Sequence, residues 1–434
     1  MSAQTAIDFF ALRHAERNPD SEPDWLTATR QTAMAQVIHH GLPTTRQENW
    51  KYTNLRSLSR KKFEPAAKVS IDVSDVPLLP NSGGPSFSFV NGRPREGQSA
   101  GDLAAQLLSE ALTDAAQALA GRLSSLVSYQ THPLAALNTA FFEDGVVIEV
   151  AAGQQIDHPL LLEFISAPST TPSLICPRVL IVLEANARLQ VVERYVGLPG
   201  AENFTSAVTE VHLGRGAQLD HYRLQEAAPG DTCTQLLAVH QAADSQLRTH
   251  SADLGGKLVR NDLHSWLCGP GAEANLSGFY MAVGSQHVDN HTRIDHNARH
   301  TTSHEDYRGV LADRARAVFN GKVVVAKDAQ KVDANQSNKN LILSGKAEID
   351  TKPELEIYAD DVKCSHGATV GQLDDDALFY LRARGIGERT ARALLTFAFV
   401  DEVLSGIEIA DLRDYIKTVV TGRLPDYERL EKLA

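Results

Sequence analysis

From about Gly145 onward, the chain is a succession of short apolar runs separated by turn residues. The runs VVIEV, LLLEFI, PRVLIVLE and LQVVERYV are rich in β-branched side chains, and Gly, Asn, Asp or Pro stands between them. Runs of this length and composition predict β-strands. In the segments on either side, apolar residues recur at helical spacing instead. The pattern therefore predicts a β-rich middle between two helical regions.

A weak internal repeat runs through the β-rich part. A small residue, any residue and Leu recur in ARLQ, AQLD, SQLR and ANLS, at steps of 30, 28 and 29 residues, through Leu189, Leu219, Leu247 and Leu276. KVDA, EIDT and KCSH follow at steps of 17 and 15 residues, through Val332, Ile349 and Cys364. A fixed period of this size indicates stacked supersecondary units. Strand-rich units predict a parallel β-helix whose inward side chains form an internal ladder.

An antiparallel β-sandwich would also give many short strands. A sandwich is marked by hairpin turns at close spacing, whereas here the same tripeptide texture returns every 28 to 30 residues. The repeat therefore favours the solenoid. On this interpretation Cys364 takes the last position of the apolar ladder, where a small thiol is a good core residue.

The region from residue 1 to about 140 is predicted to be mainly helical. DWLTATRQTAMAQVIHHG has apolar residues at helical spacing and ends at Gly41, with Pro43 just beyond as a stop. SFSFVNGRP predicts a strand and a turn through Asn91 and Gly92. DLAAQLLSEALTDAAQALAGRL predicts a further helix. We place the β-helix over residues 141–372.

Residues 373–434 return to helical spacing. Asp374, Asp375 and Asp376 stand where the first turn of a helix would begin, next to its positive end. ALFYLRARGIGERTARALLTFAFVDEVL and IADLRDYIKTVVTGRL follow as helical stretches. Because a solenoid exposes its end coils and needs caps, we expect this C-terminal helical domain to cap the β-helix.

Composition and charge indicate an ordinary globular protein and argue against several other classes. The chain has 434 residues, 43% of them hydrophobic and 22% charged, which is ordinary for a globular protein. A net charge of −12 argues against a broad nucleic-acid surface. The four cysteines are far apart and form no C-x-x-C pair. With no signal-peptide pattern and no apolar run long enough for a membrane span, we expect a cytoplasmic protein with reduced thiols.

The turn at 385–387 is the first candidate for function. LRARGIGERTARALL matches the helix–Gly-hydrophobic-Gly–helix pattern of DNA-binding hairpins. The pattern is short, three acids lie one helix upstream, and no second copy is present. A tight turn between two helices, in which the glycines serve the turn itself, is the preferred interpretation.

Five histidines between 287 and 304 are the second candidate. They are spaced by 4, 5, 4 and 4 residues in a stretch that predicts strand and turn, and they are His287, His291, His296, His300 and His304. A metal site needs three or four converging groups. Hydrogen bonding on the polar side of the solenoid explains them as well, and this interpretation is favoured.

Cys364 and His366 are the third candidate. Two residues apart on a strand, their side chains share a face. They could together ligate a soft metal such as iron, copper or zinc, but this spacing does not suit a nucleophile and its base. The ladder gives Cys364 a purely structural alternative, so both interpretations stay open for it, whereas no packing rule demands His366.

No P-loop, dinucleotide fingerprint or nucleophile elbow occurs in a convincing context. This favours a scaffold or complex subunit. A polysaccharide-active β-helix enzyme is the alternative, against which the reduced cysteines and the missing signal peptide count.

Three stretches resemble one family. PTTRQENWKYTNL at 43–55, the stretch from DANQSNKNLILSG to FYLRARGI at 333–386, and the β-repeat between them resemble the SufB/SufD family of iron–sulfur cluster assembly proteins. The entry motif WKYT and the cysteine of CSHGATVG are of the SufD kind. Gly367 stands where SufB-like members have the glutamate of HEAT, so an independent cluster-building role is not implied.

The resemblance implies a right-handed parallel β-helix and a non-catalytic subunit that pairs with SufB while its C-terminal domain docks the SufC ATPase. It places Cys364 and His366 near the SufB contact, where iron or a nascent cluster would be held jointly, with no cofactor bound tightly by this chain alone. The SufC contact would fall on Leu378–Phe399, through Phe379, Tyr380, Ile386 and Leu394. A homodimer of the isolated chain stays open.

Overall fold

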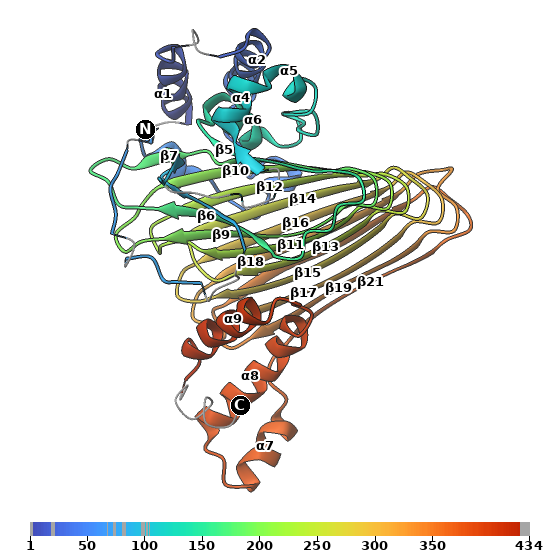
Figure 1. Ribbon diagram of the computed structural model, residues 1–434. Coiled ribbons are helices and arrows are strands. Elements are labelled where there is room, and N and C mark those ends of the chain that lie inside the picture. The colour runs from blue at the N-terminus through green and yellow to red at the C-terminus, as the bar shows by residue number, and fades with distance from the viewer. Residues whose placement is uncertain are drawn as a thin grey trace.

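The computed structural model describes residues 3–18, 22–66, 68–72, 75–79, 84–96, 100, 103 and 105–425, with side chains from residue 6 on. Its middle is a parallel β-helix of about eight turns, as predicted, and each turn gives one strand to each of two sheets. Helices lie above and below the two sheets (Figure 1). Because consecutive strands from β8 onward alternate between the sheets, each of these strands pairs with strands one whole coil away in sequence.

The first sheet, called sheet A, carries the even-numbered strands from β8 on, together with β5 and short strands at one end. Its strands are β4 (Ala105–Leu107), β5 (Gly145–Val150), β8 (Arg178–Leu183), β10 (Phe204–Leu213), β12 (Thr232–Gln241), β14 (Leu258–Leu267), β16 (His287–His296), β18 (Arg316–Val325) and β20 (Glu348–Ile357), with β7 (Ser173–Ile175) and β1 (Glu64–Pro65) joined beside β10.

The second sheet, sheet B, carries the odd-numbered strands from β9 on, together with β6 and the β2–β3 hairpin at its other end. Its strands are β3 (Arg93–Pro94), β2 (Ser86–Val90), β6 (Leu160–Ser166), β9 (Arg188–Gly197), β11 (Gln218–Glu226), β13 (Gln246–Asp253), β15 (Glu273–Ala282), β17 (Thr302–Leu311), β19 (Asp333–Ile342) and β21 (Lys363–Gly371). The β2–β3 turn runs through Asn91 and Gly92, both at positive φ, as the sequence predicts.

Strand pairing corrects part of the predicted ladder. Leu189, Leu219 and Leu247 do pair in register across β9, β11 and β13. Leu247 then pairs with Ala274, so Leu276 belongs to a column two residues further on. Val332 lies in a turn and Ile349 lies on sheet A. The turns differ in length from coil to coil. Residues at equal spacing in the sequence therefore do not always occupy the same position in successive coils.

The N-terminal helices cover the outer face of sheet A (Figure 1). α6 packs on β10 and β12. The stretch from residue 105 to 107, predicted as helix, forms β4 instead, because it pairs antiparallel with β5. Two residues at the start of that predicted helix, 102 and 104, lie outside the described residues. The helices of this region are α1 (Ala3–Ala15), α2 (Asp24–His40), the 3-10 turn η2 (Glu48–Trp50), α3 (Arg56–Ser59), α4 (Leu108–Asp114), α5 (Ala116–Leu119) and α6 (Pro133–Phe141).

The C-terminal helices α7 (Asp375–Ala383), α8 (Glu388–Leu404) and α9 (Ala410–Gly422) lie on the opposite side. Asp374 caps α7 by accepting a hydrogen bond from the Ala377 amide. α8 packs on β15 and β17, and its apolar side chains join those on the outer face of sheet B. The helices were predicted to cover the open end of the β-helix, but they cover the outer face of sheet B instead. Their apolar side chains pack there against the outward side chains of the middle coils.

Candidate functional site

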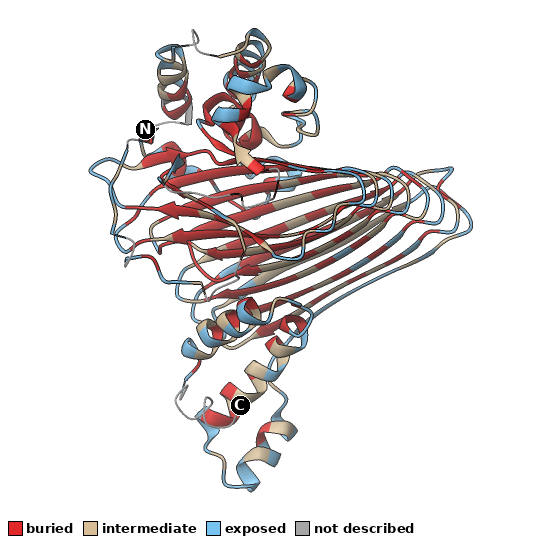
Figure 2. Cartoon of the chain, in the orientation of Figure 1, coloured by how far each residue is buried: buried red, intermediate tan, exposed pale blue. Residues whose placement is uncertain are grey.

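The β-helix ends in an open coil formed by β20 and β21. In the part of the chain that the structure describes, each of these strands pairs within its sheet with a single neighbour, β18 or β19. Most residues of β21 are exposed and most of β20 are half-buried, whereas the strands of earlier coils are largely buried (Figure 2). Such an edge presents backbone N–H and C=O groups that another chain can pair with.

Cys364 lies on the inner face of the open coil. It pairs with Ala334, which continues the column of Leu189, Leu219 and Leu247. The side chain is half-buried against the interior core. Burial raises the pKa of the Cys364 thiol, and Asp333 raises it further. The thiol is thus mainly protonated at neutral pH, so the ladder position accounts for Cys364 structurally in the isolated chain.

His366 lies two residues further along β21, on the same face as Cys364. Its neighbours in the column are Gln336 in β19 and Glu305 in β17. Both of these are buried, but the imidazole of His366 is exposed. Gly367 beside it has open space around its Cα. His366 therefore offers an accessible nitrogen at the mouth of the solenoid.

A metal ion held by Cys364 and His366 would need further ligands from elsewhere. Among the described residues, no group of three or more His, Cys, Asp or Glu side chains is placed to hold a metal ion. Two donors from one strand leave at least two positions of a tetrahedral site to be filled. Within the described chain, Cys364 and His366 therefore do not make a complete metal site by themselves.

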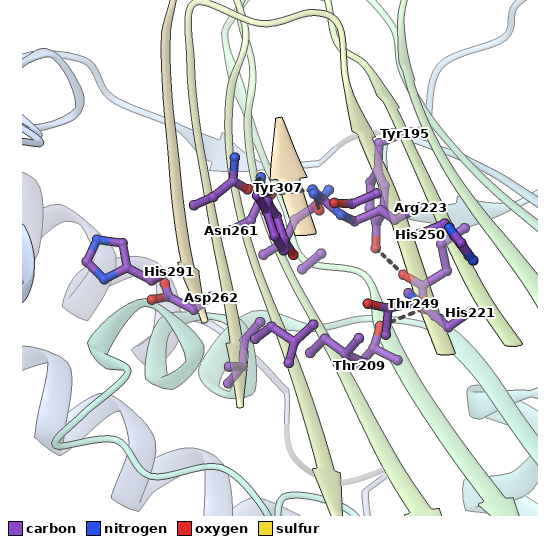
Figure 3. Close-up of a pocket in the computed structure, with 18 residues that line it drawn as sticks. Tyr195, Thr209, His221, Arg223, Thr249, His250, Asn261, Asp262, His291 and Tyr307 are labelled. Carbon is purple, nitrogen blue, oxygen red and sulfur yellow. Dashed lines mark hydrogen bonds and ion pairs between the residues drawn. The ribbon is translucent and has the colours of Figure 1, made fainter. Parts of the chain in front are cut away.

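Several coils away from the open end, the interior of the β-helix contains a cluster of polar side chains from β9, β10 and β11. Glu193 accepts hydrogen bonds from Tyr195 at 2.8 Å and from Thr209 at 2.8 Å, and its carboxylate lies 3.0 Å from the His221 imidazole. Burial pushes the pKa of Glu193 up, but the His221 contact and these hydrogen bonds outweigh it and hold the pKa below its usual range. Figure 3 shows these side chains gathered between the strands.

The same side chains line a small cavity of about 40 Å³. One polar atom of each of four lining residues is buried without a hydrogen-bond partner, in Gln235, Thr249, Ser251 and Asn290. A volume of this size holds two or three waters, and buried polar groups without protein partners are normally satisfied by water. The interior is therefore suited to hydration rather than to dry packing.

Nearer the open end, the polar interior continues with Glu305 and Gln336. The Gln336 amide nitrogen donates to the Glu305 carboxylate at 2.5 Å. Burial raises the pKa of Glu305 to about 7, while hydrogen bonds from Thr292 and Gln336 lower it less strongly. Glu305 is thus a buried carboxyl that changes its charge near neutral pH, one coil behind the strand that pairs with β21.

The sequence analysis missed these interior polar residues, although a signal was present. In LDHYRLQE, His221 and Arg223 alternate with outward residues and share the parity of Leu219. In TSHEDYRG, Glu305 has the same parity as Tyr307, a core residue. Polar residues at inward positions become visible only once the register of the coils is known.

The entry motif WKYT fastens the N-terminal segment to sheet A. The Trp50 ring stacks on the Arg260 guanidinium at 3.8 Å. Arg260 also donates to the Asn49 carbonyl at 2.7 Å, and the Thr53 hydroxyl donates to Asp289 at 2.5 Å. The structure thus gives this motif a structural role, anchoring the segment on β14 and β16.

The five histidines do not converge on one point. His287 bonds Thr53, His291 lies 2.9 Å from Asp289, and His296 bonds Thr301 and Ser303. The other two, His300 and His304, are exposed. Polar contacts within the chain therefore account for His287, His291 and His296, which are half-buried or buried.

The residues expected to contact SufC differ in exposure. Phe379 is 74% exposed and Tyr380 is 56% exposed on α7, with the Arg384 guanidinium over the Tyr380 ring. Ile386 is half-buried in the turn before α8, and Leu394 packs partly into the core beneath α8. Gly385, at φ 87°, makes the 385–387 turn that joins the two helices. The exposed surface therefore centres on Phe379 and Tyr380.

Comparison with known proteins identifies the family. Residues 164–399 match the family model "SUF system FeS cluster assembly, SufBD core domain", and residues 1–162 match "SufBD protein N-terminal region". An iron–sulfur cluster assembly SufBD family protein of Synechocystis is 33% identical over 97% of this chain and 96% of its own length. The iron–sulfur cluster assembly protein SufD of Escherichia coli is 33% identical over 91% and 92%, and SufD of Bacillus subtilis is 24% identical over 93% and 95%.

No described helix is both long and apolar enough to cross a membrane. The matched regions take in the open coil, all of α7 and α8 as far as residue 399. The chain belongs to the SufBD family of the SUF iron–sulfur cluster assembly system.

Proposed function

We propose that this chain is a non-catalytic, SufD-type scaffold subunit of the SUF assembly machinery, which pairs with SufB through its open coil and docks the SufC ATPase with its C-terminal helical domain. The observation that carries the proposal is the open coil itself. Its two strands, β20 and β21, each have an edge that pairs with no described strand, and the exposed side chain of His366 lies on the inner face of β21. A partner strand laid along this edge would complete the backbone pairing and enclose His366.

Of the two edge strands, β21 is the better docking edge. β20 carries charged residues at alternate positions from Glu348 to Glu356 and has Pro353 in its middle, and both features discourage strand addition. From Ser365 to Gly371, β21 contains no Asp, Glu, Lys or Arg, and apart from His366 its residues are small or apolar. Val370 is 49% exposed there. The same edge could pair two copies of this chain when SufB is absent.

His366 and Cys364 are the groups that we propose to take part in cluster assembly. The exposed imidazole of His366 is an available ligand for iron. The Cys364 thiol is protonated in the isolated chain, and metal binding would release its proton. Iron or a nascent cluster at this place is cargo, held jointly with ligands of the partner.

The SufC contact is proposed for the lower end of the helical domain. Phe379 and Tyr380 on α7 are large, exposed and adjacent, which is unusual for a free surface. ATP hydrolysis would occur in SufC, and this domain would transmit the resulting movement to the β-helix through α8, which packs on β15 and β17.

Substitution of His366 tests the cluster-assembly role. We expect His366→Ala to leave the fold and the complex with SufB and SufC intact, because the side chain is exposed, but to lower maturation of iron–sulfur enzymes in cells. His304→Ala, an exposed histidine on the outer face of β17, is the matched control and should mature them normally. Normal maturation with His366→Ala would show that the site is assigned wrongly.

Substitution at α7 tests SufC docking. Phe379→Asp should abolish co-purification of SufC while SufB is retained. This change is cleaner than removing residues 373–434, since that deletion would uncover the apolar outer face of sheet B. Leu12→Asp, at another exposed apolar position on α1, is the control. SufC retained at wild-type level would move the docking surface elsewhere.

A further inference from the structure

The side chain of Gln336 is held in one orientation. Its amide nitrogen donates to the Glu305 carboxylate at 2.5 Å, and an ionised carboxylate can only accept hydrogen bonds. The Gln336 carbonyl oxygen is therefore turned away from that carboxylate. This oxygen is buried and has no hydrogen-bond partner among the described residues. An acceptor left in this state normally has a missing partner.

The interior is shaped around the Gln336 amide. Gly321 in β18 stands opposite it, and a Cβ at that position would come within 1.9 Å of the amide nitrogen and 2.8 Å of its carbon. Any other residue at 321 would push the amide out of place. The close approach is therefore built into both sheets, since Gln336 comes from sheet B and Gly321 from sheet A.

The next residue in the column is His366, directly in register with Gln336. Its imidazole is exposed, and in this structure the Gln336 carbonyl oxygen is not hydrogen-bonded to it. A neutral imidazole carries one N–H, and the partner of that N–H decides which ring nitrogen is left with a lone pair. In many metal sites the imidazole N–H donates to a carbonyl oxygen, and that bond fixes the choice. The unpartnered Gln336 carbonyl oxygen, on the neighbouring strand in register with His366, is the candidate acceptor here.

We propose that Gln336, oriented by Glu305, is a positioning residue that accepts a hydrogen bond from one ring N–H of His366. The bond fixes the tautomer of His366 and leaves its other nitrogen available to iron at the open coil. The metal part of this inference rests on the proposed function, whereas the tautomer part does not. Cys364 has no side chain of this kind to accept a hydrogen bond from it, because its neighbour in the column is Ala334.

The test uses the full chain with ¹⁵N-labelled histidine rings, recorded over a series of pH values up to about 8.5 so that the neutral ring is observed. The His366 signals are identified by their loss in His366→Ala. In the wild-type chain we expect the two ring nitrogens of His366 to report one dominant tautomer. In Gln336→Leu they should move to the mixed values of a free imidazole, and Glu305→Gln, which lets the Gln336 amide turn over, should give intermediate values.

Asn335→Ala is the matched control. Asn335 is the preceding residue on the outer face of β19 and donates to the Ser365 hydroxyl at 2.6 Å, so it touches β21 without facing His366. In the Asn335→Ala variant, the ring signals of His366 should equal those of the wild type. Unchanged ring signals in both Gln336→Leu and Glu305→Gln would overturn the proposal, and the second variant decides the matter if the first does not fold.

The iron part is tested separately, on the complex co-purified with SufB and SufC under anaerobic conditions. Titration with Fe²⁺ should show binding about 10-fold weaker in Gln336→Leu than in Asn335→Ala. Equal Fe²⁺ binding combined with a changed tautomer would overturn the metal part alone. Normal enzyme maturation with His366→Ala would instead contradict the proposed function and leave the ring-nitrogen result standing.

Discussion

The first coil of the β-helix and the coils that follow it share a backbone but differ in the side chains that fill their interior. The first coil, β5 and β6, is filled by apolar side chains such as Ile148 and Leu162, which are essentially inaccessible to solvent, as is Ile181 in the next coil. Polar side chains enter the interior from β9 on, beginning with Glu193. The later coils place Glu305 and Gln336 at equivalent inward positions. Apolar filling alone stabilises a solenoid, and buried polar groups cost stability unless they are fully paired. The polar interior is therefore best understood through the open coil that it leads to.

The largest effect is expected in the apolar coils. Ile181→Ala should lower the free energy of unfolding by about 2 to 5 kcal/mol, because it leaves a cavity in a tightly packed interior. Chemical denaturation at neutral pH measures this. A loss well below 1 kcal/mol would mean that the first coils are no better packed than the later ones, and the comparison would fail.

The next effect concerns the charge of Glu305. Its pKa is about 7 in the folded chain against 4.5 ordinarily, so the folded state binds the extra proton and stability falls as pH rises between these values. Glu305→Gln removes this loss, and should be more stable than the wild type by up to about 3 kcal/mol above pH 8. Near pH 4.5 the two should differ little.

Thermal unfolding of wild type and Glu305→Gln across this pH range measures the difference. An advantage of the variant that stays constant with pH would show that Glu305 does not titrate in the folded chain. Asp75→Asn, an exposed carboxyl outside the β-helix, is the control and should show no such pH dependence.

The smallest effect is expected for a hydroxyl facing the cavity. Thr249 is buried and its hydroxyl has no protein partner. Thr249→Val removes the hydroxyl at nearly constant volume, so stability should change by at most about 1 kcal/mol in either direction. A much larger loss, measured by the same denaturation, would mean that this hydroxyl makes a strong hydrogen bond and that the cavity is not simply hydrated.

The sequence predicts the β-helix well because the period of the repeat and the β-branched runs depend on local chemistry. It fails on register, since Leu276 lies two residues beyond the column of Leu247 and Ile349 lies on the other sheet. Turn lengths set these shifts, and no local pattern reports them. For the same reason, the face on which α8 packs could not be predicted from its own apolar stripe.

For the candidate site, the sequence singles out Cys364 and His366 through their spacing and family motif, but not the residues behind them. Glu305 and Gln336 are about 30 residues apart, and each looks like an ordinary polar strand residue. Their relation to His366 exists only across coils. Long-range register is therefore the information that the sequence alone lacks.

The central claim is that the open coil is the docking edge of the scaffold. Hydrogen–deuterium exchange of the chain alone and in complex with SufB tests it most directly. We predict that the backbone amides of β21, exposed at the edge in the isolated chain, become strongly protected in the complex, while those of the apolar first coils are protected equally in both. Unchanged exchange in β21, with new protection elsewhere, would contradict the account.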